Sequence, residues 1–364
     1  MKIAQVSPLF ESVPPRLYGG TERIVSYLTE ELVRQGHEVT LFASGDSVTS
    51  AELVPFCDMA LRLNPSVKDP IPYHLMMLDE VRRQADRFDV IHFHTDLLHL
   101  PLVRDFAGRT VTTLHGRLDL VDLPAFYRTF SDAPLVSISD DQRRPLAGAN
   151  FVRTVPHGLP PDLLPFSDRA HGGYLAFLGR ISPEKGPEAA IAIAERAGLP
   201  LRMAAKIDAA DLDYWTSVVE PLVRTKPHVT FVGEIDEREK ARFLGNALAL
   251  LVPVDWPEPF GLVMIEAMSC GTPVIAFRRG SVPEIVEHGR SGFVVDTVGG
   301  AVEAVGWLDS LSRQEVRRAF EERFTAQRMA ADYLDVYRGL SGVRLDAAHL
   351  RRAAGGRQSL QVVA

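Results

Sequence analysis

Short runs of apolar, often β-branched residues alternate along this chain with longer segments of helical periodicity. Lys2–Val6 predicts a buried strand, and Thr21–Gln35 predicts a helix because Ile24, Leu28 and Leu32 recur on one face. Uninterrupted apolar runs separated by helices are typical of parallel strands that are buried on both faces. The same pattern predicts further strands at His37–Phe42, Asp89–Phe93, Arg109–Leu114 and Pro134–Ile138.

A second series of strands and helices begins near Tyr174. Its predicted helices are Pro187–Arg196, Asp236–Phe243 and Gly261–Ser269. Its predicted strands are Tyr174–Leu178, Leu201–Ala205, Val229–Val232, Leu248–Val252, Pro273–Phe277 and Gly292–Val295. The order predicts an α/β protein with two successive doubly wound, Rossmann-like domains.

The domain limits follow from this series. We expect an N-terminal domain at 1–157 and a C-terminal domain at 158–325, joined through the Pro-rich segment His157–His171. Ala326–Tyr337 carries Met329, Tyr333 and Tyr337 at helical spacing, so we expect 326–340 to form a helix that returns to the first domain. Residues 341–364 show no core stripe and are expected to form a frayed or disordered tail.

Composition excludes several classes of function. The 364 residues are 46% hydrophobic and 24% charged, as in ordinary globular proteins. With 40 basic and 47 acidic residues, the chain gives no reason to expect a nucleic-acid partner. Residues 1–155 contain 16 basic and 20 acidic residues, so at most weak peripheral membrane contact is expected.

Localisation is predicted from other features. The start shows no signal-peptide pattern, and the chain has no run of about 18 apolar residues that could span a membrane. The two cysteines, Cys57 and Cys270, form no metal-binding pattern. We therefore expect a cytoplasmic protein.

Four stretches fall where ligands bind in doubly wound sheets, beyond the carboxyl ends of the strands. The first is Gly19-Gly20-Thr21-Glu22. Paired glycines before a helix let a phosphate approach free backbone N–H groups at the positive end of the helix dipole. The alternative is an ordinary flexible loop.

The second stretch is Gly179-Arg-Ile-Ser-Pro-Glu-Lys-Gly186. Arg180 and Lys185 would lie in one loop after a strand, and both side chains suit phosphate oxygens. The alternative is a pair of solvated loop cations.

The third stretch, Trp256–Gly271, contains two carboxylates. Glu266 is surrounded by apolar residues, and a buried ionised carboxylate needs hydrogen-bond or charge partners, which ligand hydroxyls could supply. The alternatives are a structural salt bridge or an exposed helix face. Glu258 lies between two prolines, which favours a fixed acceptor in the cleft over a simple complement to the helix dipole.

The fourth stretch, Thr112–Gly116, would project His115 from the end of a strand. Most histidines are surface groups or satisfied core groups, and this chain has 11. Asp211-Leu-Asp213 is the one Asp-x-Asp candidate for a metal, but it falls in a predicted helix and is expected on a solvated face. No metal site is predicted.

Together these stretches resemble the family-4 glycosyltransferases, which are retaining enzymes of the GT-B fold. The resemblance extends to about residue 340. Its most specific element is the Glu-x7-Glu pattern of Glu258 and Glu266, with GGTE near the N-terminus and GRISPEKG in the second domain. It implies two Rossmann-like domains that face a central cleft.

The resemblance also implies roles for individual residues. Glu258 would bind donor-sugar hydroxyls, Glu266 would bind the ribose hydroxyls, and His115 would lie beside the donor sugar. Arg180 and Lys185 would neutralise the diphosphate. Backbone at Gly19, Gly20, Phe260, Gly261 and Leu262 would assist them, and the base would rest against Val232 and Gly233.

This sequence departs from the family pattern at two places. His157-Gly158 stands where members often have Asn-Gly, which puts the interdomain role of that turn in doubt. Ala205-Lys206-Ile207-Asp208 replaces a glycine-rich turn, so Lys206 is a candidate to approach the ligand.

The resemblance implies transfer of a hexose from a nucleotide diphosphate sugar to a small-molecule or glycan acceptor. Because the sequence shows no convincing metal site, we expect this transfer to be metal-independent and cofactor-free, with Arg180 and Lys185 neutralising the diphosphate. UDP-linked glucose is the first candidate donor. The acceptor would contact loops Phe10–Tyr18, His94–His99 and Arg117–Tyr127. Two alternatives stay open: a sugar-nucleotide epimerase of GT-B architecture, and a non-catalytic nucleotide-sugar-binding protein. The absence of any Gly-x-Gly disfavours a nicotinamide-dependent oxidoreductase.

Overall fold

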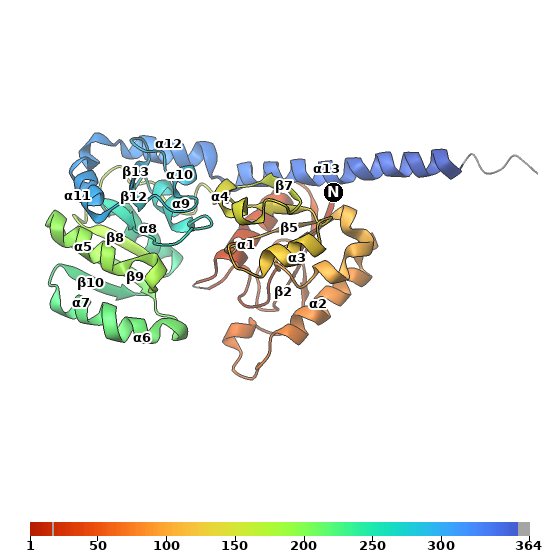
Figure 1. The fold of residues 1–364 in the computed structure, drawn as a ribbon, viewed down its shortest axis with the longest axis horizontal. Coiled ribbons are helices and arrows are strands. Elements are labelled where there is room, and N and C mark those ends of the chain that lie inside the picture. The colour runs from red at the N-terminus through yellow and green to blue at the C-terminus, as the bar shows by residue number, and fades with distance from the viewer. Residues whose placement is uncertain (17, 356–364) are drawn as a thin grey trace, which may run out of the picture.

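A computed structural model describes residues 1–16 and 18–355 of the protein. The described chain forms two wholly parallel sheets, one on each side of the segment 155–174 (Figure 1). The first sheet has the strand order β3 (Glu52–Pro55), β2 (Glu38–Ala43), β1 (Lys2–Val6), β4 (Val90–Phe93), β5 (Thr110–Thr113), β6 (Leu135–Ser137) and β7 (Phe151–Thr154). The second has the order β10 (Val229–Gly233), β9 (Leu201–Lys206), β8 (Leu175–Arg180), β11 (Ala249–Val252), β12 (Val274–Phe277) and β13 (Gly292–Val295).

In each sheet the chain first adds strands on one side of the first strand and then on its other side. This reversal of strand order falls between β1 and β4 in the first sheet and between β8 and β11 in the second. This is the doubly wound arrangement, and it confirms the predicted fold class. Loops that leave such strands diverge to opposite sides and open a crevice at the carboxyl edge of the sheet. The stretches that begin at Gly19 and Trp256 follow β1 and β11, and the stretch that begins at Gly179 starts in the last two residues of β8, so all three lie at these two reversal points.

Helices connect the strands and cover the sheets. In the first domain they are α1 (Gly20–Arg34), α2 (Ile71–Arg83), α3 (Leu123–Thr129) and α4 (Asp140–Arg143). In the second they are α5 (Pro187–Ala197), α6 (Leu212–Tyr214), α7 (Glu220–Thr225), α8 (Glu237–Gly245), α9 (Leu262–Ser269), α10 (Val282–Ile285), α11 (Val298–Gly306) and α12 (Arg313–Arg323). No helix of the described residues is apolar over a length that would carry it across a bilayer.

The apolar core is continuous between the two domains. One cluster includes Ile3 and Val90 of the first sheet and Leu250 and Val274 of the second. Buried residues of the connecting segment join these two parts: Val155, Leu159 and Leu164. Because neighbouring residues of a strand face opposite ways, Ala4 and Leu251 belong to separate clusters on the outer faces of their sheets.

The last helix, α13 (Ala326–Gly355), leaves the second domain and runs along the first (Figure 1). Met329, Tyr333 and Tyr337 are completely buried. The Tyr333 hydroxyl lies 2.8 Å from Thr113 Oγ1, and the Tyr337 hydroxyl lies 2.8 Å from His92 Nδ1. The helix therefore ties the end of the second domain to β4 and β5.

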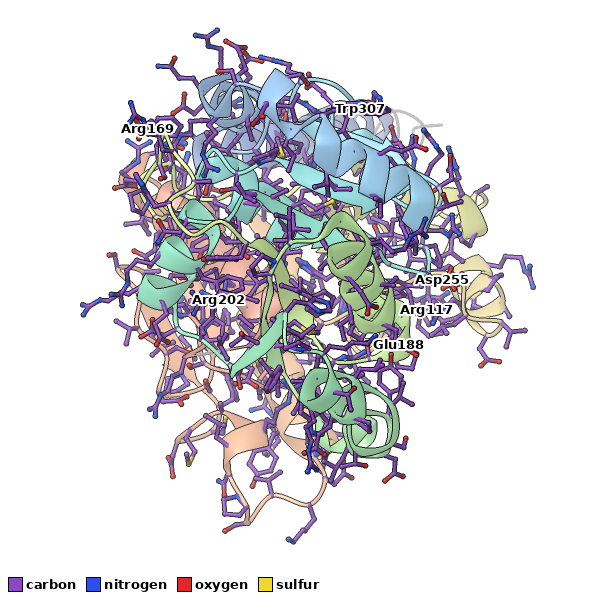
Figure 2. All side chains as sticks on the ribbon, turned by 90° about the vertical axis from the view of Figure 1, so that its left-hand side faces the viewer. Arg117, Arg169, Glu188, Arg202, Asp255 and Trp307 are labelled. Atoms are coloured by element: carbon purple, nitrogen blue, oxygen red, sulfur yellow. The ribbon has the colours of Figure 1, made fainter. Side chains whose placement is uncertain are left out.

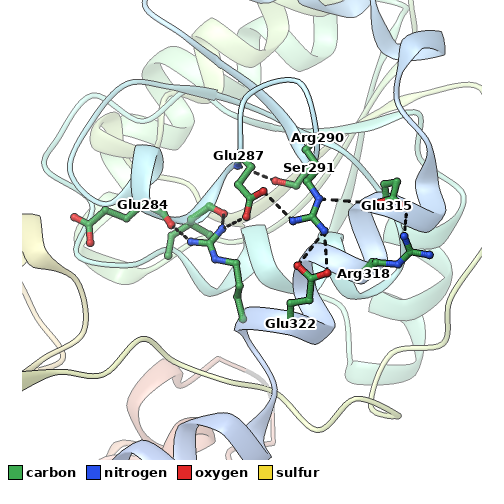
Figure 3. Close-up of polar contacts among 9 residues, drawn as sticks. Glu284, Glu287, Arg290, Ser291, Glu315, Arg318 and Glu322 are labelled. Carbon is green, nitrogen blue, oxygen red and sulfur yellow. Dashed lines mark hydrogen bonds and ion pairs between the residues drawn. The ribbon is translucent and has the colours of Figure 1, made fainter.

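A second polar contact joins the domains through Glu284 of α10. Its carboxylate accepts hydrogen bonds from the backbone N–H groups of Asp140 and Asp141, each at 2.7 Å. Figure 3 shows this carboxylate pointing away from an ion network around Arg290, which binds Glu322 at 2.9 Å and Glu287 at 3.0 Å. The network holds α12 against the loop that follows α10, so the backbone at Glu284 is fixed.

The structure differs from the sequence-based expectation in three elements. β3 and β7 were not predicted, because both are edge strands whose residues stay half-exposed and show no buried run. The helix expected at 326–340 is longer, since α13 continues to Gly355, while the expected frayed or disordered tail stays a prediction. Residues 341–355 are rich in Ala, Leu and Arg, which favour helix without a core stripe. The remaining tail, 356–364, lies outside the described residues.

Candidate functional site

A pocket with about 690 Å³ of atom-free space lies between the two domains. The first domain contributes the loop before α1 and the first turn of that helix. The second contributes the ends of β8 and β9, the start of α8, and one face of α9. The lining residues from these segments include Arg16, Tyr18, Gly19, Gly20, Arg23, Lys206, Glu237, Lys240, Leu262 and Glu266.

Two helix N-termini converge on this pocket. The backbone of Gly20 opens α1, and a side chain there would point at Leu262 Cδ1, 3.6 Å away, in the first turn of α9. Gly261 caps α9 with φ of 79°, a left-handed conformation that glycine adopts most easily. Free N–H groups of both first turns therefore flank one space, which suits an anion.

Glu266 is buried at 3% exposure, and a lysine accompanies it. Lys240 of α8 donates to Glu266 Oε1 at 2.7 Å and lies 3.5 Å from Glu237. The structural salt bridge that the sequence left open as an alternative is therefore present in the ligand-free protein. Lys240 satisfies the carboxylate, which removes the cost of burying it unpaired.

The ion pairs continue across the domain boundary. Arg23 of α1 forms an ion pair with Glu237, which also faces Lys240. The run Glu266, Lys240, Glu237 and Arg23 alternates in sign, so its net charge is zero. A ligand that binds Glu266 would therefore become a partner of a carboxylate whose charge is already balanced by the neighbouring ion pairs.

Glu258 is likewise paired. Lys185 contacts its carboxylate, and the indole N–H of Trp256 donates to the same oxygen at 2.9 Å. The Lys185 ammonium also lies 4.7 Å from the centre of the Trp256 ring. Gly280 makes this loop possible, since a Cβ at that position would lie 2.4 Å from the backbone nitrogen of Glu258.

The first domain reaches this loop through Arg117. Its guanidinium lies 5.7 Å from the Trp256 ring centre, and Figure 2 labels Arg117 close to the neighbouring Asp255. Trp256 therefore has a cation from each domain within cation–π range. Closure of the cleft would move Arg117 and Trp256 together.

Arg180 points to acidic groups of its own domain. It donates to Glu184 at 2.6 Å and lies 3.4 Å from Asp211. Its expected contact with a diphosphate would need the guanidinium to turn away from these groups. Asp211, the first residue of the Asp-x-Asp candidate, is thus an ion-pair partner of Arg180.

His115 follows β5 at the end of the first sheet. Its Nε2 lies 2.8 Å from His94 Nδ1, and its ring stacks on His157 with centroids 5.2 Å apart. Burial lowers the pKa of His115 to about 3 and lowers the pKa of His94 well below its usual range. At neutral pH both rings are therefore uncharged.

Of the remaining predicted residues, Lys206 lines the pocket, whereas Phe260, Val232 and Gly233 do not. Phe260 is 2% exposed and packs edge-on against His157, so only its backbone can serve a ligand. Val232 and Gly233 end β10 just before the pocket wall, which begins at Glu234. Lys206 lines the pocket and lies 5.3 Å from the ring centre of Tyr18.

Sequence reasoning missed several residues of the cleft. Lys240 had one available signal, because it lies three residues before Phe243 on the apolar face of its helix. Asp96 had none: it is an exposed non-glycine residue at φ of 48°, three residues after β4 ends at Phe93.

Comparison with known proteins gives matches over both domains. Residues 18–162 match the family model described as Glycosyltransferase Family 4, and residues 169–325 match Glycosyl transferases group 1. A phosphatidyl-myo-inositol mannosyltransferase of Mycolicibacterium smegmatis is 27% identical, over 94% of this chain and 95% of that protein.

Solved structures agree with these matches. A glycosyltransferase involved in avilamycin A biosynthesis superposes with a TM-score of 0.71 at 25% identity, covering 94% of this chain and 98% of that one. The Anabaena protein HepE in complex with UDP-glucose superposes with a TM-score of 0.67 at 18% identity, covering 93% and 100%. At that identity the second likeness bears on the fold alone.

Proposed function

This chain belongs to the GT-B glycosyltransferases of the family 4 type, and we propose that it transfers a hexose from a UDP-linked donor to an acceptor hydroxyl. Glucose is the first candidate sugar, and the reaction retains the anomeric configuration without a metal. The observation that carries the proposal is the convergence of Glu266 and two helix N-termini, α1 and α9, on one interdomain pocket. HepE, which shares the fold, was solved with UDP-glucose, so we would test that donor first.

Donor binding would use the paired carboxylates of the cleft. The ribose hydroxyls would donate to Glu266, and Lys240 would remain at its side because Glu237 also holds it. The diphosphate would lie against the N-termini of α1 and α9 and would draw Lys185 away from Glu258. Glu258, freed of part of its ion pair, would then accept hydrogen bonds from the sugar.

The two substrates supply every bond and proton that the transfer step requires. The bond between the anomeric carbon and the β-phosphate oxygen breaks, and UDP leaves with the electron pair. The acceptor oxygen bonds to the anomeric carbon from the same face, and its proton passes to the departing phosphate oxygen. Lys185 and the helix N-termini stabilise the charge that builds on this phosphate. No second carboxylate is assigned to a covalent intermediate.

Closure of the two domains would exclude water that would otherwise hydrolyse the donor. The acceptor would enter from the first domain, beside Asp96 and the loop that carries Arg117. The neutral ring of His115 would lie between this acceptor space and the donor sugar. An uncharged group there avoids opposing the positive charge that develops on the anomeric carbon.

A thermal-shift panel of nucleotide sugars tests the donor, because a ligand that binds only the folded protein raises its stability by mass action. UDP-glucose should give a larger shift than ADP- or GDP-linked sugars. An acceptor screen with the best donor should then release UDP, and NMR of the product should show retention. An inverted linkage would refute the stereochemical assignment.

The two alternatives have distinct outcomes in the same experiment. An epimerase would change the sugar when the donor is incubated alone. A non-catalytic binder would give a thermal shift but release no UDP with any acceptor.

A further inference from the structure

A continuous chain of hydrogen bonds runs from His115 to the C-terminal helix. His115 Nε2 lies 2.8 Å from His94 Nδ1, and His94 Nε2 lies 2.8 Å from Gln5 Oε1. Gln5 Nε2 donates to the hydroxyl of Tyr337 at 3.1 Å. Gln5, His94 and Tyr337 are all completely buried or 1% exposed, so water does not compete for these contacts. The chain therefore links the cleft to α13 through the first sheet.

The direction of each hydrogen bond follows from the chemistry of Gln5. An amide oxygen only accepts, so His94 must carry its proton on Nε2. Because the neutral imidazole has one N–H, His94 Nδ1 is then an acceptor. His115 must therefore donate to it from Nε2, which leaves the lone pair on Nδ1 of His115.

The contacts beyond Tyr337 do not set a further tautomer. The hydroxyl of Tyr337 accepts from Gln5 Nε2 and lies 2.8 Å from His92 Nδ1, and His92 Nε2 lies 2.7 Å from Thr113 Oγ1. A hydroxyl both accepts and donates, so these two contacts leave the tautomer of His92 unassigned. The contact with Gln5 Oε1 assigns the Nε2–H tautomer to His94 and His115, and a flipped Gln5 amide would make both of them Nδ1–H.

We propose that Gln5 and Tyr337 are positioning residues that fix His115 as the Nε2–H tautomer and hold its ring at one angle in the cleft. The inference rests on the proposed function for the role of His115 beside the donor sugar, whereas the tautomer itself is a property of the ligand-free fold. His157 braces the other side of the ring, since its own ring stacks on His115 with an interplanar angle of 18°.

The fixed tautomer limits what His115 can do. Its Nδ1 is buried and has no hydrogen-bond partner within the part of the chain that the structure describes. Burial also keeps the ring neutral, because it lowers the pKa of His115 to about 3. His115 can therefore offer only a lone pair at Nδ1, and it serves neither as a cation nor as a proton donor at that atom.

NMR of the full-length, ligand-free protein labelled with ¹⁵N-histidine tests the tautomer directly. Two-bond correlations between ring nitrogens and ring protons distinguish Nε2–H from Nδ1–H, and single His→Gln variants assign the signals. We expect the Nε2–H pattern for His94 and His115. An Nδ1–H pattern for His115 would overturn the inference. This measurement needs no substrate, so it stands even if the protein transfers no sugar.

A pair of matched variants tests the positioning role. Tyr337→Phe removes the hydroxyl that orients Gln5, so an Nδ1–H population of His115 should appear. We expect kcat to fall about tenfold, as for the loss of other supporting hydrogen bonds, with KM for the donor unchanged. Tyr333→Phe is the control, because its hydroxyl is equally buried on the same helix but contacts Thr113, outside the link from Gln5 to His115.

The control should leave the His115 signals unchanged and kcat within about twofold, since a lost hydrogen bond elsewhere acts on stability alone. Equal effects of the two variants on kcat and on the His115 signals would contradict a specific role for Tyr337. Loss of transfer with every donor and acceptor, together with the expected wild-type tautomers, would instead refute the proposed function and leave the tautomer assignment intact.

Discussion

Replacement of Lys185 by alanine gives the sharpest separation of catalysis from stability. The ammonium of Lys185 contacts Glu258 and lies over the ring of Trp256. In Lys185→Ala, Glu258 keeps the 2.9 Å hydrogen bond from Trp256 and its 7% exposure, but it loses its cation. The same change removes the mobile charge that we assign to the leaving diphosphate.

The stability cost should be modest. Breaking a fully buried ion pair costs about 3–5 kcal/mol, but the Lys185 side chain is 23% exposed and Trp256 still supports the carboxylate. We therefore expect a loss of about 1–2 kcal/mol in the free energy of unfolding. Urea denaturation of the two proteins measures it.

The catalytic cost should be larger. Removing one group that stabilises charge developing in the transition state costs about 3–4 kcal/mol, or roughly 10²- to 10³-fold in kcat. Initial rates of UDP release at saturating donor and acceptor measure this. Lys226→Ala is the control: its ammonium also pairs with a glutamate of the second domain, Glu195 at 2.5 Å, but on the exposed outer surface.

If kcat of Lys185→Ala stayed within about threefold of the control, Lys185 would serve only to neutralise Glu258, and the assignment of the phosphate-binding cation would fail.

Three further outcomes are expected. Glu266→Gln should weaken UDP binding about 10- to 100-fold by isothermal titration calorimetry, because a neutral amide accepts hydroxyl donors less strongly; unchanged affinity would place the ribose elsewhere. Burial raises the pKa of Glu22 from 4.5 to about 7, so the folded protein binds more protons than the unfolded chain between these values, and stability falls as pH rises. Between pH 4.5 and 8 the wild type should lose about 3 kcal/mol more than Glu22→Gln in urea denaturation, and parallel pH profiles would contradict this. Transfer rates should be the same with and without EDTA, and a loss restored by Mg²⁺ or Mn²⁺ would refute metal-independent transfer.

The sequence predicted elements best where burial is continuous. β1 and β13 have the predicted bounds, since Ile3–Val6 and Gly292–Val295 are buried without interruption. The edge strands β3 and β7 were not predicted from the sequence, because half-exposed residues produce neither an apolar run nor a clean alternation of apolar and polar residues. The length of α13 was also not predicted, because Ala, Leu and Arg after residue 340 favour helix without forming an apolar stripe in the sequence.

The candidate site could be predicted only in part. Glu266 and Gly20 both line the pocket. They could be predicted because they lie in stretches that follow strand ends, which a single sequence reveals. The Lys240–Glu266 pair depends on how α8 packs against α9, and residues 26 positions apart give no local signal. The direction in which Arg180 points likewise depends on Asp211, which belongs to a different loop.

A crystal structure of the protein with UDP tests the central claim most directly. The account predicts both ribose hydroxyls on Glu266, with Lys240 beside them, and the diphosphate against Lys185 and the first turn of α9. UDP bound elsewhere, with the 2.7 Å contact between Lys240 and Glu266 undisturbed and no hydroxyl on that carboxylate, would contradict it.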